Sequence, residues 1–171
     1  AGATPVADGG SGSARVHWSP QGESVLVLGD ATLMLVDLAG DVTEIDLGDL
    51  DGDLRDALLS PDGSRVLLHL VEDDGAAAVY ILTLADGRNR EVTAVSTSAQ
   101  HGITNLQWLP DGAGIVYMRG PMVQGVAMRG QLYRYILGQE VPVLLATSGQ
   151  GGPSATITDA TVSPDGRKVA Y

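Results

Sequence analysis

The sequence predicts an all-β protein, and three observations support this prediction. A short turn, Ser-Pro-Asp-Gly or a close variant of it, occurs four times in the 171 residues, with its proline at positions 20, 61, 110 and 164. The turns are flanked by apolar runs of roughly four to eight residues, which is the length of a buried strand. Glycine is abundant, with 23 residues, and Asp-Gly pairs favour tight hairpins because both residues tolerate positive φ.

Each turn marks one copy of a repeating unit, and successive prolines are 41, 49 and 54 residues apart. A period in this range is typical of propellers and solenoids. In each complete unit one apolar run leads into the turn, a second follows it, and two more complete the unit, as at 79–82 and 90–95 in the second copy. Four such strands form an antiparallel sheet that cannot bury both faces alone. Radial stacking of these sheets, or blades, buries both, so we expect a β-propeller.

The turns divide the chain into blades at 14–50, 54–97 and 102–147, and a partial blade at 157–171. The predicted propeller is therefore incomplete, with three blades and half of a fourth. Residues 1–13, rich in small and polar residues, are expected to be flexible or to supply a strand that closes the ring. Three interpretations stay open: a longer polypeptide, a small ring closed by residues 3–8, and two chains that combine.

The repeated turn is interpreted as structural rather than catalytic. Proline at the second position, aspartate at the third and glycine at the fourth meet the backbone needs of a tight turn. The first and third copies replace its aspartate or its serine, with Gln21 and Leu109. Trp18 and Trp108 directly precede the turn where the other copies have Leu59 and Val162, which indicates an apolar packing position.

The repeat resembles a known family. The apolar strand, the turn, the second apolar strand and the third-strand endings Val36–Gly40 and Leu82–Gly87 are similar to the TolB-type propeller repeat, which also builds the propeller of prolyl-oligopeptidase-type serine peptidases. The resemblance covers residues 14–171. It implies the fold and an extracytoplasmic setting, and it does not imply one function, because propellers carry many.

Composition restricts the function classes. The net charge of −11 disfavours binding to nucleic acid and to anionic lipid. The absence of cysteine excludes disulfides, zinc–thiolate sites and thiol nucleophiles, and no apolar run reaches the length of a membrane helix. The three histidines lie at unrelated positions of the repeat, and no catalytic triad is indicated.

One acidic loop is a candidate metal site. Asp49, Asp51 and Asp53 alternate along it, and carboxylates at this spacing can converge on Ca²⁺. In the helix-loop-helix calcium site a glutamate closes the loop at position 12, whereas this loop has Ser60 there. Calcium is the one cofactor considered, and a solvated acidic loop is the alternative.

A long loop in the third blade, residues 119–130, is the candidate partner-binding site. Exposed methionine and valine would suit a protein contact, since methionine adapts to irregular surfaces, and folding back onto the blade is the alternative. The candidate residues are Arg119, Met122, Val123, Val126, Met128 and Arg129.

The sequence therefore predicts a non-catalytic propeller scaffold that mediates protein–protein interaction as part of a larger extracytoplasmic protein or assembly. Its partner is expected to be a protein, and self-association or continuation of the chain would close the ring. Two alternatives remain: the accessory propeller of a serine peptidase whose catalytic domain lies elsewhere, and a propeller that binds calcium or a small ligand.

Overall fold

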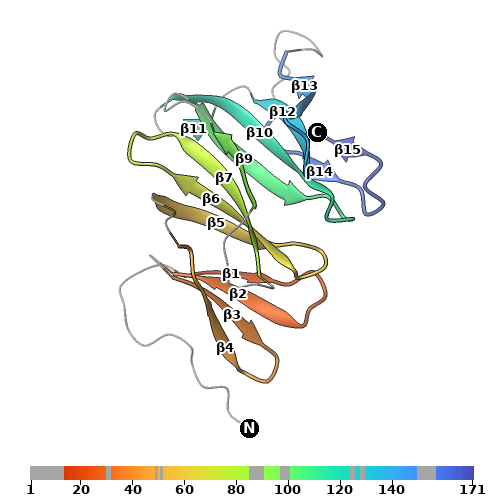
Figure 1. Cartoon of the computed structure of the whole chain (residues 1–171). Coiled ribbons are helices and arrows are strands. Elements are labelled where there is room, and N and C mark those ends of the chain that lie inside the picture. Colours follow the sequence, from red (N-terminus) through yellow and green to blue (C-terminus); the bar gives the residue numbers. More distant parts are fainter. Residues whose placement is uncertain are drawn as a thin grey trace.

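The computed structural model describes residues 14–29, 32–48, 50, 52–84, 91–96, 101–123, 126–127, 130–149 and 157–171, and only the backbone of 91–96, 122–123 and 126–127. These residues confirm the predicted all-β fold. They form antiparallel sheets that follow one another along the chain without closing a ring (Figure 1). In the part of the chain described, no helix has the length and apolarity that crossing a bilayer requires.

Three sheets have the meander order expected of blades. The first contains β1 (Arg15–Trp18), β2 (Ser24–Leu28), β3 (Leu33–Asp37) and β4 (Val42–Ile45). The second contains β5 (Asp53–Leu59), β6 (Arg65–Val71), β7 (Ala77–Thr83) and β8 (Glu91–Ser96). The third contains β9 (His101–Trp108), β10 (Gly114–Val123), β11 (Val126–Ala127), β12 (Gln131–Ile136) and β13 (Val143–Thr147). A last hairpin pairs β14 (Thr161–Val162) with β15 (Val169–Ala170).

The four repeated turns share one hydrogen-bond pattern, which explains why the sequence repeats. In the second copy Gly63 N donates to Ser60 O at 2.9 Å, and Ser60 N donates to Arg65 O at 2.8 Å. The same pair of bonds recurs in the other three copies. The fourth turn residue has φ between 67° and 73° in every copy, a conformation that glycine adopts without steric cost.

The turns also stack on one another from blade to blade. A Cβ placed on Gly112 would lie 3.8 Å from Pro61 Cδ, and one on Gly166 would lie 3.5 Å from Pro110 Cδ. Between the first two turns, Gln21 Nε2 donates to the carbonyl oxygen of Pro61. The second, third and fourth turns therefore each lie close to the turn of the preceding blade.

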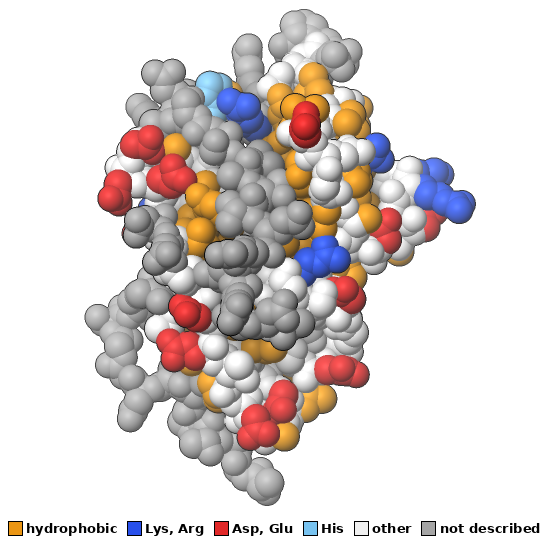
Figure 2. All heavy atoms as spheres, in the orientation of Figure 1, with side chains coloured by type: hydrophobic (Ala, Val, Ile, Leu, Met, Phe, Trp, Pro, Cys, Tyr) orange, Lys and Arg blue, Asp and Glu red, His pale blue; other side chains and the backbone are white. Residues whose placement is uncertain are grey.

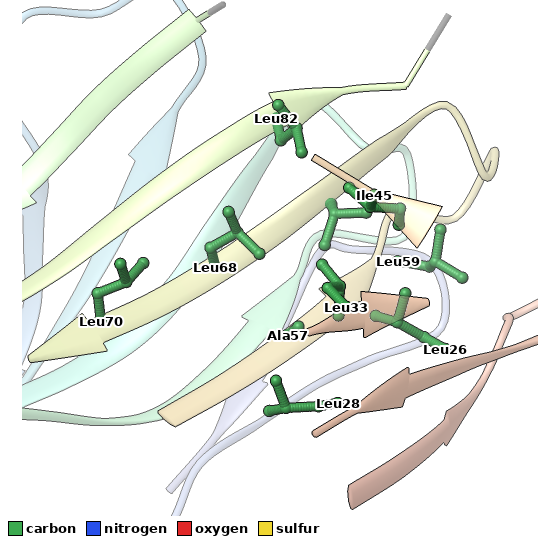
Figure 3. Close-up of a cluster of buried hydrophobic side chains, with 10 residues drawn as sticks. Leu26, Leu28, Leu33, Ile45, Ala57, Leu59, Leu68, Leu70 and Leu82 are labelled. Carbon is green, nitrogen blue, oxygen red and sulfur yellow. The ribbon is translucent and has the colours of Figure 1, made fainter. Parts of the chain in front are cut away.

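An apolar core separates the first and second sheets (Figure 3). Alternate residues of β2 and β3, such as Leu26, Leu28 and Leu33, meet the facing residues Leu59 and Leu68 of the second sheet. A second cluster joins the second sheet to the third, and a third joins the third sheet to the β14–β15 hairpin. Burial of aliphatic side chains between sheets thus supplies the core that a chain without phenylalanine needs.

The third sheet differs from the expectation in one respect. β10 continues to Val123, and its end pairs with β11 through Met122↔Ala127 and Val123↔Val126. Part of the predicted loop at 119–130 is therefore a strand hairpin, since its backbone groups pair with each other.

Candidate functional site

The serines of the repeated turn use their hydroxyl groups within the turn. Ser60 Oγ donates to Asp62 Oδ1 at 2.5 Å and accepts from Arg65 N at 3.0 Å, and its side chain is fully buried. Ser163 makes the corresponding bonds to Asp165 and Lys168. Bonds from Ser60 and Ser64 lower the pKa of Asp62 to about 2. This network orders the turn and leaves Ser60 inaccessible to a substrate.

The first strand of each sheet, which we call the inner strand, carries a polar residue four positions before its turn. These residues are Arg15, Asp56, Asn105 and Asp159 on β1, β5, β9 and the segment before β14. Asn105 Nδ2 donates to Asp159 Oδ1, across the gap between the third blade and the last hairpin. Inner strands of successive blades therefore lie against each other through polar side chains.

In the first and third blades, a polar residue two positions before the turn adds to these contacts. His17 Nε2 of β1 lies 3.0 Å from Asp56 Oδ1 of β5. Gln107 Nε2 of β9 donates to Ala160 O at 2.5 Å. Both side chains reach from one blade to the next, so this position connects neighbouring inner strands.

A cavity of about 630 Å³ opens between the second and third blades at the beginning of their inner strands. Its polar lining includes Arg15, Arg55, Asp56, His69 and His101. Its apolar lining includes Val71, Ala77, Ile103 and Leu106. The volume is within the range of small-molecule binding sites, and few polar groups over an apolar wall are typical of them.

Irregular backbone shapes both walls of this cavity. The pairing of β5 with β6 shifts between Leu54 and Asp56, which leaves Arg55 in a bulge. The pairing of β9 with β10 shifts near Asn105, whose φ is +52°, an unusual value for a residue other than glycine. Bulges redirect side chains at functional sites, so these two irregularities position the residues of the cavity.

His69, on β6, is the least satisfied polar side chain of the cavity. Its Nε2 atom is buried and has no hydrogen-bond partner among the described residues. Burial lowers the pKa of His69, the nearby Asp56 raises it, and Arg55 and Arg15 lower it. The imidazole is therefore favoured in its neutral form beside two guanidinium groups.

Two of the three predicted calcium ligands lie outside the described residues. Asp49 and Asp51 are not among the described residues. Asp53 is described, and its exposed carboxylate lies 3.1 Å from Arg55 Nη2. The calcium site stays a prediction, and so does calcium as a cofactor.

The predicted partner residues also stay a prediction. Arg119 is half-buried on β10, and Met122, Val123 and Val126 lie in the β10–β11 hairpin with undescribed side chains. Met128 and Arg129 are outside the described residues.

Sequence reasoning missed the cavity, although one signal for its surroundings was present. Alignment on the turn places a polar residue four positions before it in all four copies, and another two positions before it in every copy except the second, which has Leu58. The cavity itself combines residues from several strands at unrelated repeat positions, such as Arg55, His69 and His101. No local pattern brings these residues together.

The outward face of the first sheet is apolar and lacks a covering sheet in the described structure. Val16 and Trp18 of β1 are 58% and 64% exposed, and their cross-strand partners Val27 and Val25 are half-buried. Trp108, at the same repeat position in the third blade, packs against the second blade and donates from Nε1 to Leu58 O at 3.0 Å. Trp18 is therefore exposed, unlike Trp108, and no described residues cover it.

Comparison with solved structures establishes the fold class as a TolB-like β-propeller. TolB from Acinetobacter baumannii superimposes with a TM-score of 0.65 at 21% identity, over 93% of this chain and 37% of that protein. A prolyl endopeptidase also gives 0.65, at 16% identity, over 92% of this chain and 25% of the peptidase. The resemblance suggested by the repeat is thereby confirmed at the level of fold.

Comparison by sequence is less extensive, and no family model matches the chain. A protein of unassigned function from Agrobacterium fabrum is 31% identical over 103 residues, which are 59% of this chain. The chain spans about a third of the length of that relative and of Acinetobacter TolB.

Proposed function

We propose that this chain is a non-catalytic propeller scaffold that forms part of a larger ring of blades and mediates protein–protein contacts outside the cytoplasm. The uncovered apolar face of the first sheet is the observation that carries the first part of the proposal, the larger ring of blades. Val16, Trp18 and Val42 are exposed there, whereas the corresponding faces of the second and third sheets are buried. Large exposed apolar faces mark interaction surfaces.

The repeat supports a further blade as the cover of this face. Leu59 and Trp108, at the position of Trp18, both point towards the preceding blade. A further blade of the same polypeptide would give Trp18 the same environment, with a backbone carbonyl to accept its Nε1–H. The greater length of the relatives supports this source over a second copy of the chain.

Oxidative footprinting of Trp18 and Trp108 tests this proposal. In the 171-residue chain we expect hydroxyl radicals to oxidise Trp18 several-fold faster than Trp108. In the full-length gene product, Trp18 should be protected to the level of Trp108, which serves as the internal reference. Continued rapid oxidation of Trp18 in the full-length product would overturn the proposal. Protection of Trp18 in the 171-residue chain at high concentration would also overturn it, because a second copy of the chain would then cover the face.

Three observations support the remaining parts of the proposal. The turn serines are committed to local hydrogen bonds, which favours a non-catalytic role. The TolB-type resemblance and the acidic, cysteine-free composition favour an extracytoplasmic setting. The segment at 119–130 is the proposed partner contact, and replacement of residues 122–128 by Gly-Ser, which keeps the pairing of β10 with β9 and β12, should abolish capture of the partner.

The fold likeness to prolyl endopeptidase favours one second candidate, the accessory propeller of a serine peptidase. In that case the chemistry would belong to a separate domain. A Gly-x-Ser-x-Gly motif in the remainder of the gene, with peptidase activity of the full-length product, would favour this candidate over the scaffold.

A further inference from the structure

We propose that the cavity between the second and third blades binds a small organic carboxylate with an apolar body. The proposal depends on the charge, the unsatisfied polar group and the apolar wall of the cavity. It does not depend on the proposed function, because the cavity lies between the second and third blades and not on the outward face of the first sheet.

Two arginines supply the charge. The whole chain has 10 Lys and Arg against 21 Asp and Glu, yet Arg15 and Arg55 line the cavity with one carboxylate, Asp56. Asp56 Oδ1 lies 3.0 Å from His17 Nε2 and accepts from Ala57 N at 3.0 Å. Among the residues that line the cavity, the two guanidinium groups thus outnumber the one carboxylate, and that carboxylate already accepts a backbone hydrogen bond.

The two arginines are held together, and among the described residues each donates one side-chain hydrogen bond. Arg15 Nη1 donates to the backbone carbonyl of Arg55, which fixes Arg15 beside β5. Arg55 Nη2 is 3.1 Å from Asp53 Oδ2, and both side chains are largely exposed, so this ion pair is weak. A guanidinium group has five N–H donors, and the unused ones suit the two oxygens of a carboxylate.

His69 adds a polar group that needs a partner. A buried polar atom without a hydrogen bond is uncommon in a folded protein, and His69 Nε2 is such an atom among the described residues. Its location on the same cavity as Arg15 and Arg55 makes a ligand oxygen a suitable partner, with the neutral imidazole donating from Nε2.

The apolar wall selects the rest of the ligand. Val71, Ala77, Ile103 and Leu106 offer no charged group to a ligand, and Ala77 and Ile103 are buried. An aliphatic chain attached to the carboxylate would displace water from this wall, which favours binding in proportion to the apolar area covered. Inorganic phosphate offers charge without such a body.

Isothermal titration with hexanoate tests the proposal on the full 171-residue chain. We expect saturable binding of hexanoate, and a loss of affinity of about tenfold or more in Arg55→Gln and in Arg15→Gln, since a charged hydrogen bond is worth about 1.5–3 kcal/mol. Arg134→Gln is the matched control, because Arg134 is exposed on β12 outside the cavity. It should bind within twofold of the parent.

A comparison of two ligands on the unmodified chain tests the proposal even if the variants fold poorly. Hexanamide has the same apolar body without the charge, and we expect it to bind the unmodified chain at least tenfold more weakly than hexanoate. Equal binding of hexanamide and hexanoate would overturn the role of the arginines. Equal binding of inorganic phosphate would overturn the role of the apolar wall, and undetectable hexanoate binding would overturn the proposal as a whole.

Discussion

At the scale of single residues, the repeated turn shows that its backbone bonds persist when one side-chain hydrogen bond is lost. The second turn has both Ser60 and Asp62, joined at 2.5 Å, and Asp62 also accepts from Ser64 N at 3.1 Å. The third turn has Leu109 instead of serine, and Asp111 accepts from Ala113 N at 2.9 Å. The backbone bonds of the two turns are the same, so the side-chain bonds add to a turn that the backbone already forms.

The pKa of Asp62 gives a prediction for acid solution. Because its pKa falls from 3.8 to about 2 on folding, the unfolded chain binds a proton first, and the stabilisation by Asp62 is lost as the pH falls from about 4 to about 2. At pH 7, Asp62→Ala should cost about 1 kcal/mol, limited by the exposure of this carboxylate to solvent. Urea denaturation at several pH values measures the difference.

Asp111→Ala is the control for this variant. It should cost less at pH 7, because Asp111 has no serine hydroxyl within its turn. If Asp62→Ala and the parent chain differ by the same amount at pH 2 and at pH 7, the assigned role of the ionised carboxylate is wrong.

At the scale of the secondary-structure element, the approach of β10 to β12 depends on one glycine. A Cβ on Gly114 would collide with the carbonyl oxygen of Tyr135, on the paired strand β12. The residues after Gly114 carry the core between the second and third sheets, where Tyr117 stacks on Tyr133 with ring centroids 5.5 Å apart. A shift of β10 would therefore disturb this core as well.

Gly114→Ala should consequently destabilise the chain by about 3 kcal/mol, within the range for overpacking against backbone. Gly130→Ala is the matched control: its Cβ would meet the flexible end of Met118, with Cε 2.7 Å away, and should cost about 1 kcal/mol or less. The urea midpoints of the two variants measure the difference. Equal midpoints would show that the close approach of β10 to β12 at Gly114 does not set the cost.

The elements also show what the sequence could predict. The turns and their flanking strands were predictable because Pro, Asp and Gly set backbone angles locally and the apolar runs have strand length. The bulge at Arg55 and the left-handed Asn105 were not, since both depend on pairing with β6 and β10. The candidate site was missed for the same reason, because its residues meet only when three blades are in place.

At the scale of the whole molecule, negative charge is dispersed. Acidic side chains (red) are spread over the face shown in Figure 2, and basic groups gather mainly on the β14–β15 hairpin and the third blade. Dispersed charge of one sign keeps a chain soluble and opposes compaction through self-repulsion. Any cation reduces that repulsion by screening, so a specific calcium site must stabilise the chain beyond the effect of ionic strength.

Calcium binding at Asp49, Asp51 and Asp53 predicts a rise in melting temperature with CaCl₂ that exceeds the rise with MgCl₂ at equal ionic strength. The reason is that binding to the folded state alone stabilises it by mass action, whereas screening depends only on ionic strength. Asp51→Asn should remove the excess. Equal effects of the two salts on the melting temperature would eliminate the calcium site.

The stacking of Gly112 on Pro61 and of Gly166 on Pro110 has an evolutionary consequence. Because part of the contact between blades is made by the short turn that defines each repeat, a duplicated gene segment would carry both sides of that contact. The loops at the other end of the blade do not take part in this contact between turns, so their length can vary. The unequal distances of 41, 49 and 54 residues between prolines agree with loops whose length varies from blade to blade.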